Sequence, residues 1–200
     1  MKPITPLTDA ELKQGIQSAV AYMGARRPGE AVRTLRHLAS RKPDDFDILH
    51  LLGSAHVMDG RSAEGIRMLK RAGELKPDAP ALWMNLGGAL ERNGNLAEAE
   101  EAYAKALAAL PSLADASQRL CIVRIAQGKL DEASRQAETF VALHPGNDIA
   151  NMTIGLVRLQ QDRPGDAAAA FRKALEIAPY NRPAREQLQL ALEQEKRRQA

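Results

Sequence analysis

Residues 80–113 decide the fold: PALWMNLGGALERNGNLAEAEEAYAKALAALPSL. Apolar residues recur there at steps of three and four residues on both sides of Gly94, a pattern typical of two amphipathic helices. Glycine commonly ends a helix and proline cannot continue one, so Gly94 and Pro111 mark the ends of the first and the second helix. The stretch therefore predicts a helical hairpin.

The hairpin pattern recurs along the chain with a constant period. Five prolines stand 34 residues apart, and columns of small residues and of loop glycines keep the same step. A period of this length indicates one supersecondary unit that stacks on copies of itself. Small residues are expected where two antiparallel helices cross most closely, so Cys121 is interpreted as a small buried filler. The prolines are Pro43, Pro77, Pro111, Pro145 and Pro179; the small columns are Gly53, Gly87, Cys121 and Gly155, and Ala31, Gly65, Ala99, Ala133 and Ala167; the loop glycines are Gly60, Gly94 and Gly128.

Composition and charge fit a folded helical protein of 200 residues. Aromatic residues make up only 4% and alanine is plentiful, which suits closely packed helices better than a sheet. The formal charge is +3, and the excess bases are interleaved with acids, so no nucleic-acid partner is expected. No stretch approaches the roughly 20 apolar residues that span a membrane, and the N-terminus lacks a signal-peptide pattern. With a single cysteine, the chain is expected to be cytoplasmic and not inserted in a membrane.

One repeat carries a family pattern most plainly. Its residues reproduce W-x-x-L-G…A…Y/F…A…P and resemble the tetratricopeptide repeat family, and the resemblance extends over nearly the whole chain. It implies an all-α, right-handed superhelical solenoid of helix-turn-helix repeats. In the first repeat Gly15 replaces the usual large aromatic residue, and in later repeats Arg124 and Arg158 replace its usual aromatic partner. The residues that carry the resemblance are Trp83, Leu86, Gly87, Ala99, Tyr103, Ala106 and Pro111.

The period also places both ends of the array. Thr8 and Glu11 have the spacing of a capping box and are expected to start the first helix. A last helix is expected at 182–198, with Gln189 where the small column would fall, and it is interpreted as a solvating cap. The expected division is a lead-in at 1–11, five repeats at 12–45, 46–79, 80–113, 114–147 and 148–181, and a capping helix with a charged tail at 182–200.

The resemblance implies a partner site, because the first helices of successive repeats line a concave groove in this family. The residues at the groove positions are more apolar than solvent exposure alone would predict, and methionine adapts to apolar partners. We therefore expect the groove to bind another protein through an extended or helical segment with apolar anchors. For each apolar residue alone, a place in the core is the competing interpretation. The candidate groove residues are Val20, Met23, His50, Val57, Met58, Met84, Gly88, Arg92, Gln118, Ile122, Ile125, Met152, Leu156 and Leu159.

A second binding mode of the family is not favoured. In that mode Lys, Asn and Arg in the groove hold the C-terminal carboxylate of a chaperone peptide. The early groove positions here carry Ile16, Val20, His50 and Ser54, which supply few cations. One arginine and one asparagine in the central repeat do not make such a clamp.

No residues suggest catalysis, a cofactor or a metal site, so the protein is not expected to be an enzyme. His50 and His56 share a helix but are six residues apart, whereas a metal-binding pair needs three or four. The first functional hypothesis is a stand-alone bacterial scaffold or adaptor. The alternative is the recruiting region of a larger bacterial enzyme or complex, for example a sulfotransferase or an oxygenase. Self-association through apolar surface is a third hypothesis.

Overall fold

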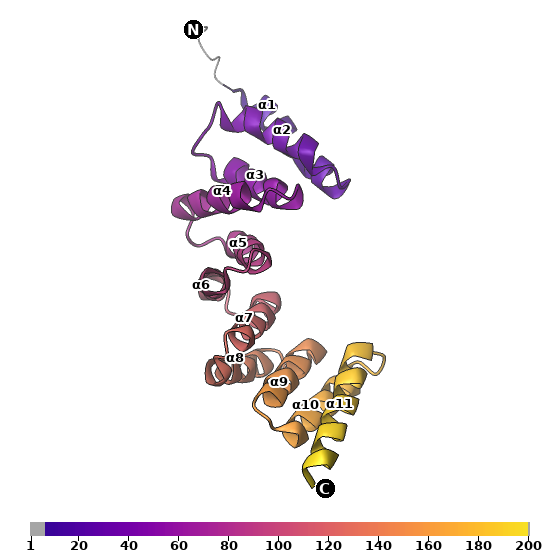
Figure 1. The fold of residues 1–200 in the computed structure, drawn as a ribbon. Helices are drawn as coiled ribbons and strands as arrows, with labels where there is room; N and C mark the ends of the chain where they lie inside the picture. The colour runs from indigo at the N-terminus through magenta and orange to yellow at the C-terminus, as the bar shows by residue number, and fades with distance from the viewer. Residues whose placement is uncertain (1–6, 200) are drawn as a thin grey trace. The chain divides into compact units, whose positions relative to one another are not determined.

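The computed structural model describes residues 7–199, and in that range it contains helices and no strands (Figure 1). The predicted all-α architecture is confirmed, including the C-terminal helix. The first helix begins at Asp9, directly after the Thr8 cap that the sequence predicts, so residues 9–11 of the predicted lead-in are helical. The helices are α1 (Asp9–Gly24), α2 (Pro28–Ala39), α3 (Phe46–Met58), α4 (Ser62–Leu75), α5 (Pro80–Arg92), α6 (Leu96–Ala109), α7 (Ala114–Ala126), α8 (Leu130–Leu143), α9 (Asp148–Gln160), α10 (Pro164–Ile177) and α11 (Arg182–Gln199).

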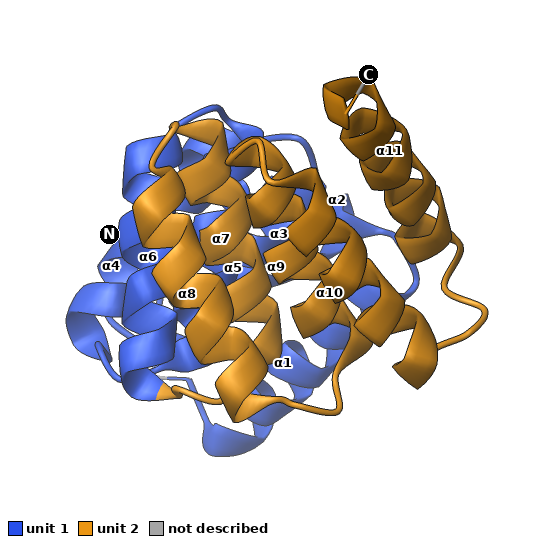
Figure 2. Cartoon of the chain, turned by 90° about the horizontal axis from the view of Figure 1, so that it is seen from below, with its two compact units in different colours: residues 1–109 blue, residues 110–200 orange. Residues whose placement is uncertain are grey.

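The chain divides into two compact units, Met1–Ala109 (unit 1) and Leu110–Ala200 (unit 2), which are coloured separately in Figure 2. In unit 1 the hairpins α1–α2, α3–α4 and α5–α6 pack one after another, and first helices contact each other, α1 with α3 and α3 with α5. In unit 2 the hairpins are α7–α8 and α9–α10, and α11 packs on α10 and α9. Each unit therefore has the hairpin arrangement that the period predicts, while the limits of the single repeats stay a prediction.

Helix α1 begins as its sequence predicts. The Thr8 hydroxyl accepts a hydrogen bond from the Glu11 N–H at 3.2 Å, and the Thr8 N–H donates to the Glu11 carboxylate at 2.8 Å. These reciprocal bonds satisfy backbone donors that have no partner inside the helix. The predicted capping box is confirmed.

The turn between the paired helices keeps one backbone shape in all five hairpins. Gly60, Gly94 and Gly128 have φ angles of 81°, 79° and 74°. One period before and one period after this column, Arg26 and Asp162 both have a φ of 56°. A side chain is unfavourable in this left-handed region because its Cβ crowds the following carbonyl group. The packing of the hairpins therefore imposes the turn even where glycine is missing.

The small columns lie where paired helices are closest. A Cβ atom built on Gly53 would meet Leu69 Cγ at 2.7 Å, and one built on Gly155 would meet Phe171 Cε1 at 2.5 Å. Atoms at these distances overlap, so no larger residue fits unless the helices move. Cys121 in the same column is fully buried, and burial raises the pKa of its thiol to about 12. It is therefore a buried filler whose thiol stays protonated at neutral pH.

Candidate functional site

Unit 1 carries the larger part of the predicted groove residues, on three first helices that contact one another. Its most exposed apolar members are Val20, 50% exposed on α1, and Met58, 49% exposed at the end of α3. Met84 on α5 is partly exposed. Every member of the set is at least partly accessible, and we call this set the unit 1 stripe. It consists of Val20, Met23, His50, Val57, Met58, Met84, Gly88 and Arg92.

A polar cluster links α3 and α5 within the unit 1 stripe. The Asn85 amide nitrogen lies 2.8 Å from His50 Nε2 and donates to Ser54 Oγ at 3.3 Å. Because an amide nitrogen only donates, His50 Nε2 carries no proton here and accepts the hydrogen bond. Burial lowers the pKa of His50, opposed in part by Asp47, and so favours the neutral ring. Sequence reasoning placed His50 in the groove but missed this link, which the spacing of one period plus one residue could have indicated.

Two members of the unit 1 stripe also serve the core. Met23 packs against the buried cluster of α1, α2 and α3, which includes Leu35. Val57 Cγ2 lies only 2.5 Å from the place of a Cβ atom on Gly65, so Val57 fills the crossing between α3 and α4. For Met23 and Val57, the competing interpretation of a place in the core is therefore correct in part.

In unit 2 the predicted groove residues are all partly buried and partly shared with the core. Ile125 packs against the cluster around Cys121. The three predicted residues of α9 pack against the cluster of Phe171 and Ala191, as do apolar side chains of α11. The C-terminal helix therefore takes up part of the apolar surface around α9. The unit 2 residues are Gln118, Ile122 and Ile125 on α7, and Met152, Leu156 and Leu159 on α9.

A comparison with known families decides the identity of these hairpins. A sequence profile described as the tetratricopeptide repeat matches residues 16–74, 51–114 and 122–182. The chain belongs to the tetratricopeptide repeat family. The predicted fold class, an all-α solenoid of tetratricopeptide repeats with a C-terminal helix, is thereby confirmed. No curated protein sequence matches the chain.

Several solved structures share the tetratricopeptide fold of this chain. A structure of the MamA protein superposes with a TM-score of 0.76 at 23% identity, covering 87% of this chain and 97% of the other. MamA from Desulfovibrio magneticus RS-1 has a TM-score of 0.76 at 20% identity, with 88% and 98% covered. YrrB, described as a TPR protein with an unusual peptide-binding site, has a TM-score of 0.73 at 18% identity, with 86% and 89% covered. At these identities the likeness shows the fold alone.

Arginines link neighbouring elements of the tetratricopeptide hairpins in unit 2. Arg158 on α9 donates to Ser134 Oγ at 2.8 Å and to Glu138 Oε1 at 2.7 Å, both on α8. The hydrogen bond from Arg158 holds the pKa of the Glu138 carboxyl below its ordinary value. Arg124 on α7 makes a longer ion pair, with 3.8 Å between its Nε and Glu132 Oε2. Ion pairs therefore replace aromatic packing at the positions where the family pattern is broken.

His56 stands in the column of Arg124 and Arg158, but in the buried core of unit 1. It is 3% exposed, and its Nδ1 has no hydrogen-bond partner among the described residues. Burial lowers the pKa of His56, and the nearby Arg61 and Arg36 lower it further. The folded state therefore favours the neutral imidazole.

Replacing His56 by leucine is expected to make the stability less dependent on pH. In the unfolded chain His56 takes up a proton as the pH falls through about 6.5, whereas the lowered pKa in the folded chain delays this step. The free energy of unfolding therefore falls as the pH drops from about 7.5 to about 5.5, and His56→Leu should lose less of it. Leu90 is buried at the same position of the next repeat, so leucine suits this column. Thermal denaturation at both pH values measures the difference, and an equal loss in the two proteins would refute the assignment.

The described part of the chain offers no ready centre for metal chemistry. Within residues 7–199, no three His, Cys, Asp or Glu side chains are grouped so that they could hold a metal ion. Among the helices of that range, none combines the length and the apolar character needed to cross a membrane.

Proposed function

We propose that this chain is a non-catalytic cytoplasmic scaffold or adaptor, and that the unit 1 stripe binds an extended or helical segment of another protein. The observation that carries the proposal is the exposure of Val20 and Met58, each about half accessible, on first helices that contact one another. Met84 adds a third apolar side chain from α5. Apolar surface left in water commonly marks an interaction site, because burying it contributes roughly 25 cal/mol per Å².

The polar cluster also favours one position of the bound segment along the proposed site. The side-chain oxygen of Asn85 has no hydrogen bond to the described residues, while its nitrogen is held by His50 and Ser54. This oxygen can therefore accept a hydrogen bond from a main-chain N–H of the bound segment. A bound segment must satisfy its main-chain groups as well as bury its anchors, so a fixed acceptor between apolar side chains favours one register.

The main anchors are proposed for unit 1, because α11 takes up apolar surface around α9 in unit 2. YrrB, which shares the fold, is described as having an unusual peptide-binding site, and this description supports a peptide segment as the class of ligand. The five repeat ranges derived from the period are retained as the proposed division of the chain.

A photo-activatable amino acid in place of Met58 tests the proposal in the source cell. We expect a specific crosslink to another protein from position 58 and none from position 104, because Ala104 is exposed on α6 outside the stripe. A crosslink only to a second copy of the chain would assign the stripe to self-association and reject the adaptor function. The absence of any crosslink from position 58 would also contradict the proposal.

A further inference from the structure

The polar cluster of the unit 1 stripe contains one side chain that can change its charge near neutral pH, His50. Its Nε2 lies 2.8 Å from the amide nitrogen of Asn85, which also donates to Ser54 Oγ at 3.3 Å. An imidazole nitrogen accepts a hydrogen bond only while it carries no proton. A proton on His50 Nε2 therefore removes the acceptor that holds the amide of Asn85 in its present orientation.

Two charged side chains lie near His50. Burial lowers the pKa of His50, and Asp47, three residues earlier on α3, opposes this effect in part. Lys76 at the end of α4 has its Nζ 5.2 Å from the centre of the Phe46 ring, and that ring lies 5.6 Å from the His50 ring. The side chain that α5 presents to His50 is Asn85, which does not titrate. The ring is therefore neutral at pH 7 and takes up a proton only at a lower pH than a free histidine does.

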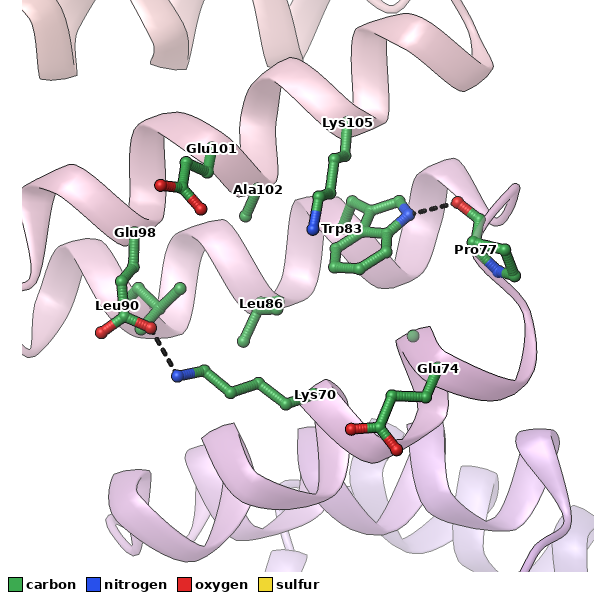
Figure 3. Close-up of a pocket in the computed structure, with 11 residues that line it drawn as sticks. Lys70, Glu74, Pro77, Trp83, Leu86, Leu90, Glu98, Glu101, Ala102 and Lys105 are labelled. Atoms are coloured by element: carbon green, nitrogen blue, oxygen red, sulfur yellow. Dashed lines mark hydrogen bonds and ion pairs between the residues drawn. The ribbon is translucent and has the colours of Figure 1, made fainter.

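Helix α5 is held in place through a different face from the one that carries Asn85. Trp83 and Leu86 are buried, and Figure 3 shows them on the side of α5 that faces α4 and α6. The Trp83 Nε1 group donates to the Pro77 carbonyl oxygen at 2.7 Å, which ties α5 to the preceding turn. Asn85 itself is exposed. Its amide can therefore turn over about its own side-chain bond while the helix stays in place.

The pair formed by His50 and its partner on the next first helix differs from the equivalent pairs in other repeats. One period earlier the pair is Ile16 and Leu51, and two periods later it is Gln118 and Thr153. None of these four side chains titrates near neutral pH. Any pH sensitivity of this row is therefore assigned to the step between α3 and α5.

A proton on His50 reverses what the polar cluster needs from Asn85. The protonated Nε2 donates, so the carboxamide turns over and places its oxygen where its nitrogen was. That oxygen accepts from His50 and from the hydroxyl of Ser54, which both donates and accepts. The amide nitrogen then takes the place of the oxygen. The group that Asn85 offers to a bound segment thus changes from an acceptor to a donor.

We propose that protonation of His50 turns over the Asn85 amide and thereby weakens binding of the partner segment at the unit 1 stripe. The proposal rests on the function proposed above for this stripe. While His50 is neutral, the Asn85 oxygen accepts a hydrogen bond from a main-chain N–H of the segment. When His50 is charged, the same N–H meets the NH₂ group of the amide, and two donors cannot pair. The protonated form is expected to bind about tenfold more weakly, because one hydrogen bond is lost and its donor is left without a partner.

NMR of the isotope-labelled chain tests the turnover without any partner. At about pH 7.5, where His50 is neutral, we expect a coupling through the hydrogen bond between Asn85 Nδ2 and His50 Nε2, which only an N–H···N contact gives. On acidification the coupling should vanish, and the side-chain NH₂ signals of Asn85 should shift with the same midpoint as the His50 ring. In the matched control His50→Gln, which cannot titrate, these signals should stay constant. Absence of the coupling at neutral pH, or Asn85 signals that ignore the His50 midpoint, would overturn the switch.

The crosslink from position 58, made in a lysate of the source cell, tests the effect on binding. Its yield should fall severalfold when the pH is lowered below the His50 midpoint, with circular dichroism to show that the helices are kept. Asn85→Ala should give a lower yield at neutral pH and change little on acidification, because it has no amide to turn. Equal yields of the wild type at both pH values would overturn the effect of His50 on binding. Absence of a crosslink at both pH values would instead contradict the proposed function, so the two failures are distinguishable.

Discussion

Replacing Gly87 by leucine is expected to lower the free energy of unfolding by about 3 kcal/mol. A Cβ atom at position 87 would lie 2.6 Å from Tyr103 Cε1 and 2.7 Å from Cδ1. The ring cannot move aside, because Tyr103 is buried and its hydroxyl donates to the Glu91 carboxylate at 2.7 Å. The added side chain must therefore force α5 and α6 apart at their closest crossing and open space around the core of this hairpin.

Urea denaturation measures this loss, and the neighbouring glycine supplies a matched control. A Cβ atom on Gly88 would meet no heavy atom closer than Arg92 Nη1 at 3.5 Å, and Gly88 is partly exposed. Gly88→Leu is therefore expected to be neutral or to gain up to about 1 kcal/mol from helix propensity. Equal stabilities of the two leucine variants would show that Gly87 does not lie at the crossing.

The helical hairpins could be predicted because each local sequence pattern recurs in several repeats. Gly53 and Gly155 stand three periods apart in the same column, and a Cβ atom at either position would meet a large side chain of the paired helix. The start of α1 depends on two residues alone, Thr8 and Glu11, whose spacing suffices for a capping box. The turn at Arg26 was not predicted, because a column of glycines does not say what happens where glycine is absent.

The candidate site could be predicted less completely, because helical spacing tells which face a residue occupies but not what packs on that face. Met152 packs against a buried cluster to which apolar side chains of α11 are also added, a contact that the spacing within α9 does not indicate. Val57 was assigned to the groove by spacing, but it also fills a crossing that is open because residue 65 is glycine. Such contacts depend on neighbouring elements, so the sequence of one helix cannot fix them.

Val20→Glu combined with Met84→Glu is expected to abolish binding of the partner segment. A carboxylate that becomes buried and unpaired against apolar anchors costs several kcal/mol, and each 1.4 kcal/mol weakens binding about tenfold. In the free protein Val20 is half exposed and Met84 is partly exposed, so both carboxylates remain in water and the helices are kept. The expected effect is thus confined to binding, which circular dichroism and thermal denaturation of the variant can verify.

The central claim is tested most directly by affinity capture from the source cell, read by mass spectrometry, with three forms of the chain. The forms are the wild type, the Val20/Met84 double variant, and a control of equal charge with Ala97→Glu and Ala104→Glu at exposed positions of α6. We predict a protein that the wild type and the α6 control both capture and that the double variant does not, with equal helicity in all three. If the double variant captures every protein that the wild type captures, the unit 1 stripe is not the partner-binding surface.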